Sequence, residues 1–149
     1  MTRVKGVGPR NRDDAELHVP QMVGKLMFEV RDMFATEDWD GLRQTHFRII
    51  ANVPHGGISV TELAQELRMS KQACGQFVTQ LAATGHLAIR ADATDRRVRV
   101  VVRTPLGDRA LKAANARIRR IERDWARRVG ADRYATFREV LEELSTGRS

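Results

Sequence analysis

One short segment combines a high density of arginine with a strand-like alternation of valine. Residues 90–107, RADATDRRVRVVVRTPLG, contain five arginines. A guanidinium group is permanently charged and presents a planar fork of donors that fits phosphate, and a rigidly held one can enter the minor groove of a duplex. Asp95 lies two positions before Arg97, so its carboxylate can orient this guanidinium through a bidentate pair. The alternative is an edge strand whose charge prevents aggregation.

The segment from Ser70 to Thr84 offers a second polar set, on one face of an expected helix. Its buried face would comprise Ala73, Cys74, Phe77, Val78 and Leu81, which leaves Lys71, Gln72, Gly75, Gln76 and Thr79 exposed. Glutamine amides at 72 and 76 can pair with adenine edges, whereas Ser70, Lys71 and Thr79 suit phosphates. Glycine is unfavourable inside a helix, so Gly75 suggests the close approach of a backbone or a base. For each residue the alternative is a solvated helix face.

Positive charge is confined to one part of the chain. The net charge is +7, and residues 86–128 contain thirteen basic and five acidic side chains, while the two kinds nearly balance elsewhere. Such a segment attracts polyanions, either nucleic acid through counterion release or an anionic membrane surface. On charge alone, a solvated face is the competing interpretation.

The residue pattern does not indicate other chemistry. His18, His46, His55 and His86 lack the spacing of zinc ligands, and we find no nucleophile triad or phosphate loop, so we expect no metal, no cofactor and no enzymatic activity. The single cysteine, Cys74, falls on an apolar helix position, which favours packing over redox sensing. No apolar run approaches the roughly 20 residues that cross a bilayer, and residues 1–14 do not read as a signal peptide. We therefore expect a cytoplasmic protein with no membrane partner.

Helices and a hairpin must position these polar sets. Apolar periodicity predicts helices over residues 20–35, 42–52, 60–67, 71–84, 106–129 and 131–145. Ser59 with Glu62 is a capping-box pattern, and Ser70 can cap the following helix. Two short helices joined by a tight turn at residues 68–69 are typical of a helix-turn-helix.

Between residues 85 and 105 the apolar period drops to two, which predicts a β-hairpin. Residues 92–95 would form its turn, because Asp and Thr side chains bond nearby backbone amides. On its second strand we expect Val98, Val100 and Val102 to face inward and Arg97, Arg99 and Arg103 to face outward. The buried valines would hold the arginines rigidly.

This order of elements is that of a winged helix-turn-helix with terminal helices, and the sequence resembles the MarR family of transcriptional regulators over about residues 18–144. The matching segments are LRQTHFRII at 42–50, ISVTELAQEL at 58–67, the serine-led helix at 70–84, GHLAIR at 85–90, and D-x-x-DRR with T-x-x-G, which comprise Asp92, Asp95, Arg96, Arg97, Thr104 and Gly107. Arg103 stands where the family usually has leucine, and Arg43 stands where it usually has threonine.

The resemblance implies a mainly α fold with a small β-hairpin wing. It divides the chain into a flexible basic arm at 1–17, a helical dimerisation region at 18–41 and 106–149, and a winged DNA-binding domain at 42–105. It assigns minor-groove contact to Arg97 and the orientation of Arg97 to Asp95. The remaining DNA contacts would come from Arg96 and Arg99 on the wing and from Ser70, Lys71, Gln72, Gly75, Gln76 and Thr79 on the recognition helix.

By this resemblance we expect a homodimer that represses transcription at a pseudo-palindromic DNA site and whose affinity a small aromatic ligand alters. The ligand would bind between the dimerisation helices and the winged domain, near Trp39, Arg43, His46 and Phe47, although core packing explains these residues equally well. An alternative function is a winged helix that binds DNA without sequence preference or contacts only proteins. Membrane-surface binding by residues 106–129 is less favoured, because Trp125 is needed at the dimer interface.

Overall fold

The computed structural model describes residues 17–147, which contain six helices and three short strands. In chain order these are α1 (Val19–Thr36), α2 (Gln44–Ala51), β1 (Ile58–Ser59), α3 (Val60–Leu67), α4 (Lys71–Ala83), β2 (Leu87–Ala91), β3 (Arg99–Arg103), α5 (Pro105–Val129) and α6 (Ala131–Ser145). The predicted mainly helical fold with a small wing is confirmed, and each helix boundary lies within two residues of its predicted place. Residues 1–16 of the predicted basic arm lie outside the described residues.

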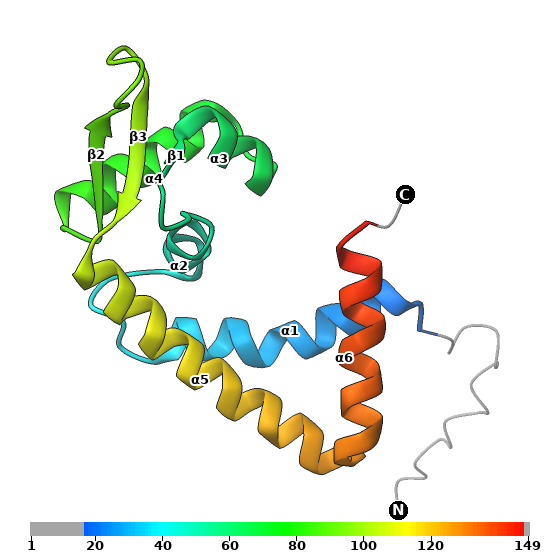
Figure 1. The fold of residues 1–149 in the computed structure, drawn as a ribbon. Helices are drawn as coiled ribbons and strands as arrows, with labels where there is room; N and C mark the ends of the chain where they lie inside the picture. The colour runs from blue at the N-terminus through cyan, green and yellow to red at the C-terminus, as the bar shows by residue number, and fades with distance from the viewer. Residues whose placement is uncertain (1–16, 148–149) are drawn as a thin grey trace, which may run out of the picture.

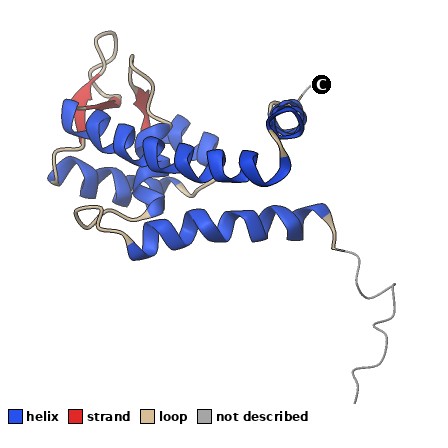
Figure 2. Ribbon diagram, turned by 90° about the horizontal axis from the view of Figure 1, so that it is seen from below, coloured by secondary structure: helices blue, strands red, loops and turns tan. Residues whose placement is uncertain are grey.

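The elements form two groups at opposite ends of α5. Helices α2, α3 and α4 gather with the sheet at the start of α5, while α6 lies at its other end and folds back beside the start of α1 (Figure 1). In the view from below, α6 is seen end-on and stands clear of the winged group (Figure 2). The described residues include no helix whose length and hydropathy would let it cross a membrane.

Side-chain caps and one left-handed residue set the helix-turn-helix. The hydroxyl of Ser59 accepts a hydrogen bond from the Glu62 amide (3.2 Å), and that of Ser70 accepts one from the Ala73 amide (3.1 Å). Such caps satisfy amides that a helix start leaves free. Between the two helices, Arg68 adopts the left-handed conformation (φ 52°, ψ 44°), which turns the chain sharply enough for α4 to pack against α3.

The wing is part of a three-stranded antiparallel sheet, in the order β1-β3-β2, rather than a hairpin alone. The two residues of β1 pair with the middle of β3, where Ile58 lies opposite Val101. The predicted inward face is wrong: Val101 is fully buried, whereas Val98 is exposed and Val100 is only half-buried. The alternation is shifted by one residue: Val101 faces the core, whereas Val100 and Val102 face the loop at Gly57. Arg103, predicted to face outward, has a side chain that is only 15% exposed and forms an ion pair with Asp108 (3.2 Å).

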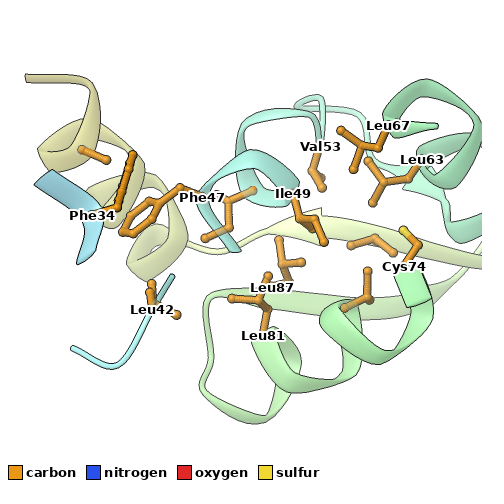
Figure 3. Close-up of a cluster of buried hydrophobic side chains, with 14 of the residues drawn as sticks. Phe34, Leu42, Phe47, Ile49, Val53, Leu63, Leu67, Cys74, Leu81 and Leu87 are labelled. Atoms are coloured by element: carbon orange, nitrogen blue, oxygen red, sulfur yellow. The ribbon is translucent and has the colours of Figure 1, made fainter. Parts of the chain in front are cut away.

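A continuous apolar core runs through the winged group and reaches α1 and α5 (Figure 3). It runs from Phe34 and Phe47 near α5 to Leu63, Leu67 and Cys74 in the helix-turn-helix. Its centre is formed by side chains that expose 2% of their area or less, among them Ile49, Leu81, Leu87 and Val101. Burial of this kind is the main stabilising contribution to the fold, at about 1.5–3 kcal/mol for each large apolar side chain.

The T-x-x-G pattern has a structural explanation at the junction between β3 and α5. The hydroxyl of Thr104 donates to the Gly85 carbonyl and accepts from the Gly107 amide (3.1 Å), so it caps α5 and ties it to the end of α4. Gly107 packs directly against the His86 carbonyl, and a Cβ at this position would collide with that oxygen. The pattern therefore permits α5 to begin in contact with the first strand of the wing.

Candidate nucleic-acid interface

A surface groove of about 800 Å³ separates the wing from the starts of α3 and α4. We call it the wing groove, and its lining consists of Ser59, Val60, Thr61, Lys71, Gln72, Gly75, Arg97, Val98 and Arg99. Three of these side chains are cationic and none is acidic. Cations that line one concave surface produce a positive potential there, which attracts polyanions.

The wing groove exists because β1 pairs with β3. This pairing places the first turn of α3, which follows β1 directly, beside the far end of the wing. The turn between α3 and α4 then brings Lys71 and Gln72 to the same side. Residues that lie up to 40 positions apart in the sequence, such as Ser59 and Arg99, therefore line one surface.

Local hydrogen bonds organise the loop between β2 and β3. The Asp92 carboxylate accepts from the Thr94 hydroxyl (2.7 Å) and from the Asp95 amide (3.3 Å). The Thr94 bond holds the pKa of Asp92 below its ordinary value, because it stabilises the ionised carboxylate. The Asp92 amide and the Val98 carbonyl then close the loop (2.9 Å). The loop is longer than the predicted four-residue turn, since it extends from Asp92 to Val98.

Asp95 and Arg97 meet at this loop, but not through the predicted bidentate pair. A single oxygen, Oδ1 of Asp95, accepts from the Arg97 backbone amide (3.1 Å) and from its Nε (3.4 Å). The Arg97 side chain is 94% exposed, so its terminal nitrogens remain free to bind another molecule. Asp95 thus contacts the Arg97 guanidinium on its Nε side only.

The structure gathers five of the predicted contact residues and leaves the others outside. Lys71, Gln72, Gly75, Arg97 and Arg99 line the wing groove. Gln76, Thr79 and Arg96 are exposed next to it, and Ser70 caps α4 with its hydroxyl. Sequence reasoning missed Ser59, Val60, Thr61 and Val98 as lining residues. Only the pairing of β1 with β3 brings the first three there, and a two-residue strand has no periodic signal.

Gly75 lies on the floor of the wing groove, although the protein's own packing does not require glycine there. An added Cβ would meet only Val60 Cγ1, at 4.0 Å, which is an ordinary van der Waals contact. The residue lies inside α4, where glycine costs about 1 kcal/mol relative to alanine.

Three of the four residues of the predicted ligand cleft, Trp39, His46 and Phe47, pack in or against the core, whereas the Arg43 side chain is exposed. Trp39 and Phe47 stack with Phe34 at centroid distances of 5.1–5.5 Å. His46 is only 6% exposed. Its Nδ1 accepts a hydrogen bond from the Arg43 backbone amide (2.9 Å), and its Nε2 lies 3.1 Å from the Gln80 side-chain oxygen. Because Nδ1 is an acceptor, the proton of the neutral ring lies on Nε2 and is donated to the Gln80 side-chain oxygen. His46 thus connects α2 to α4.

Cys74 lies in the core of the helix-turn-helix, with none of its surface exposed. Burial raises the pKa of its thiol, because the apolar surroundings disfavour the thiolate. The predicted packing role is in accord with this environment.

Apolar side chains remain exposed on the terminal helices. Those on α1 and α6 include Val19, Met22, Val23, Val140, Leu141 and Leu144, of which Leu144 is 74% exposed. Beside them, a pocket of about 270 Å³ is lined by Leu26, Trp125, Arg128, Val129, Arg133, Tyr134 and Phe137. The buried indole Nε1 of Trp125 has no hydrogen-bond partner among the described residues. Helix α6 and the start of α1 lie at the end of the molecule away from the three-stranded sheet (Figure 1).

A helix-turn-helix, a β wing and a basic groove between them define the winged helix-turn-helix class. Residues 40–98 match the sequence model of the MarR family, so this part of the chain resembles the winged helix-turn-helix of that family. No curated protein matches the sequence significantly.

Several solved structures have the same fold. The crystal structure of MarR is 18% identical in sequence to this chain. The match covers 89% of this chain and 92% of the MarR chain, with a TM-score of 0.79. MepR from S. aureus, solved in complex with DNA, is 11% identical. The match covers 88% of this chain and 98% of the MepR chain, with a TM-score of 0.70. CouR from Rhodococcus jostii, solved with p-coumaroyl-CoA, is 16% identical. The match covers 88% of this chain and 91% of the CouR chain, with a TM-score of 0.67. At these identities the likeness concerns the fold.

Proposed function

We propose that this chain is a sequence-specific, double-stranded DNA-binding transcriptional regulator. The wing groove is the observation that carries this proposal. Lys71, Arg97 and Arg99 supply its positive charge, and Gln72 supplies an amide that can pair with a base edge. The match of residues 40–98 to the MarR family and the DNA complex of MepR, which has the same fold, support it.

In this proposal α4 enters the major groove and the wing reaches the adjacent minor groove. Gln72 and Gln76 read bases from α4, while Ser70, Lys71 and Thr79 contact phosphates. On the wing, Asp95 directs Arg97 into the minor groove, and Arg96 and Arg99 contact the backbone. Residues 42–105 then form the DNA-binding domain.

The proposal includes a homodimer formed by residues 18–41 and 106–149. The exposed apolar face of α1 and α6 is the surface that a second copy would bury. A two-fold dimer presents two recognition helices about one DNA turn apart, and therefore binds a pseudo-palindrome. Occupation of such a site within a promoter represses transcription.

The proposal also includes release from DNA by a small aromatic ligand that binds between the dimerisation helices and the winged domain. Trp39 is half-buried and Arg43 is exposed, and His46 lies between this region and α4. CouR, a protein of the same fold, was solved with the aromatic thioester p-coumaroyl-CoA. A ligand that favours one dimer geometry shifts the population towards it and changes the DNA affinity.

Fluorescence anisotropy tests the central proposal. A duplex from the region immediately upstream of the gene is compared with a random duplex of equal length, at several salt concentrations. We expect tighter binding of the upstream duplex, with an affinity for both that falls steeply as salt rises. Equal affinities for the two duplexes would indicate a sequence-blind binder. The absence of any salt-dependent binding would reject nucleic acid as the partner.

A further inference from the structure

Gly75 breaks the helix-forming pattern of α4 for no reason internal to the protein. Its backbone is helical, without a positive φ. A methyl group would fit in the space beside it, touching only Val60 at 4.0 Å. Alanine would therefore stabilise the helix. The missing side chain leaves room on the floor of the wing groove, and that room is open towards whatever the groove binds.

The surroundings of Gly75 restrict what the missing side chain can accommodate. Lys71 and Gln72 lie one helical turn before it, and Thr79 lies one turn after it, on the exposed side of the helix. In the proposed DNA complex, these side chains hold the neighbouring phosphates and bases of the DNA one hydrogen-bond length away from their polar ends. A group that reaches the Cα of Gly75 must protrude further into the groove than a base edge does, and an apolar group fits there best, because the space meets the Cα of Gly75 and the Val60 methyl group rather than a polar atom.

In the major groove of DNA, the thymine C5-methyl group has both properties. We propose that Gly75 is a specificity-determining position that receives the methyl group of a thymine, in the base step next to an adenine read by Gln72 or Gln76. This inference rests on the proposed function and deepens it, because it names a base that the protein selects by shape. An alanine at this position would place its own methyl group in the same space.

Exchanging one methyl group for the other tests this inference. The duplex is one that the wild-type protein selects from a random pool, and single thymines in it are replaced by uracil, which lacks only the methyl group. The Gly75→Ala variant should bind the thymine duplex about ten-fold more weakly than wild type. Uracil at one thymine position, and at its symmetry-related position, should restore most of that affinity. The same exchange should weaken wild-type binding about three- to five-fold.

Thermal unfolding supplies a readout that separates steric exclusion from misfolding. Gly75→Ala should raise the unfolding midpoint by about 2–4 °C, since it removes a glycine from a helix interior. Gly56 is the control, because an added Cβ there would have no heavy atom within 4 Å and its φ is not positive. Gly56→Ala should leave the affinity for every duplex unchanged.

The outcomes distinguish this inference from the proposed function. If the wild-type protein selects no sequence from the pool, the proposed function fails. If it selects a sequence and Gly75→Ala binds that duplex as tightly as wild type does, the inference about Gly75 is overturned. A loss of affinity that uracil restores at no position also overturns it, because a clash with the sugar-phosphate backbone does not depend on a base methyl.

Discussion

At the scale of single residues, Arg97 and Gln76 have different environments, which predicts different effects on binding. The Arg97 guanidinium is almost fully exposed beside the wing groove and carries a charge, so Arg97→Ala should weaken specific and random DNA alike. The slope of log affinity against log salt should become shallower by about one unit. Gln76→Ala should weaken only the specific complex, by about 1–3 kcal/mol.

Anisotropy titrations with both duplexes measure these two effects. Asp95→Ala serves as a companion variant, since it frees the Arg97 side chain while keeping its charge. It should weaken binding less than Arg97→Ala does and leave the salt slope in place. If both arginine and glutamine variants lowered specific and random affinity equally, the separate roles of wing and recognition helix would be wrong.

Cys74 permits a second prediction at this scale. Its thiol is buried and its pKa is raised, so the thiolate that reacts with alkylating agents is scarce at neutral pH. Iodoacetamide should label the native protein far more slowly than the urea-unfolded protein, as followed by intact mass. Peroxide at concentrations that oxidise free thiols should leave DNA affinity unchanged. Fast labelling of the native protein would instead support redox sensing.

The candidate site was only partly predictable from single residues. Lys71, Gln72 and Gly75 could be placed together, because a helix fixes which positions share a face. The wing was harder, since residues 100–102 are three consecutive valines and supply an apolar residue to either face. The choice between the two faces is made by Ile58 and Gly57, which contact β3 from a distant part of the chain. Local periodicity contains no information about that contact.

At the scale of elements, the junction of β3 and α5 predicts the effect of a single methyl group. Gly107→Ala should destabilise the protein by about 1–3 kcal/mol, because the new Cβ overlaps the His86 carbonyl and forces α5 away from the wing. Urea unfolding measures the difference. Gly56→Ala is the control, since Gly56 has no heavy atom near an added Cβ and no positive φ.

The two glycine variants should differ in DNA binding as well as in stability. Gly107→Ala should also weaken DNA binding, since β2 and β3 set the position of Arg97. Gly56→Ala should bind like wild type. Equal stability of the two variants would show that α5 does not require close contact with His86.

Element boundaries were more predictable than element contacts. Ser59, Ser70 and Gly85 mark helix ends through local hydrogen bonds or backbone conformation, so these ends could be read from the sequence. The start of α2 falls at Gln44 rather than Leu42, because Leu42 packs in the core from the preceding loop. That difference depends on tertiary packing.

At the scale of the whole molecule, the exposed apolar face predicts the oligomeric state. Light scattering with size-exclusion chromatography should give a dimer for the wild-type protein. Leu144→Glu combined with Val140→Glu should give a monomer, because both side chains are among the most exposed apolar residues of α6. The monomer should bind a pseudo-palindromic duplex about 100-fold more weakly, since two linked half-sites gain from effective concentration.

Glu143→Gln is the control for this experiment, because Glu143 is exposed on the same helix. It should remain dimeric and bind DNA like wild type. A wild-type protein that is monomeric at micromolar concentration would contradict the dimer proposal, as would a monomeric variant with full affinity.

Helix α5 is continuous over 25 residues, and one of its ends begins at the wing while the other leads into α6. At 1.5 Å per residue this is a rod of about 37 Å. Near the middle of α5, Arg117 forms an ion pair with Glu37, at the C-terminal end of α1 (2.7 Å), so we take this point as the pivot of a tilt of α5. A tilt of about 10° about that point displaces the wing end, about 18 Å away, by about 3 Å, close to the spacing of one base pair. A rotation of this size would thus put the wing out of register with the duplex by about one base pair.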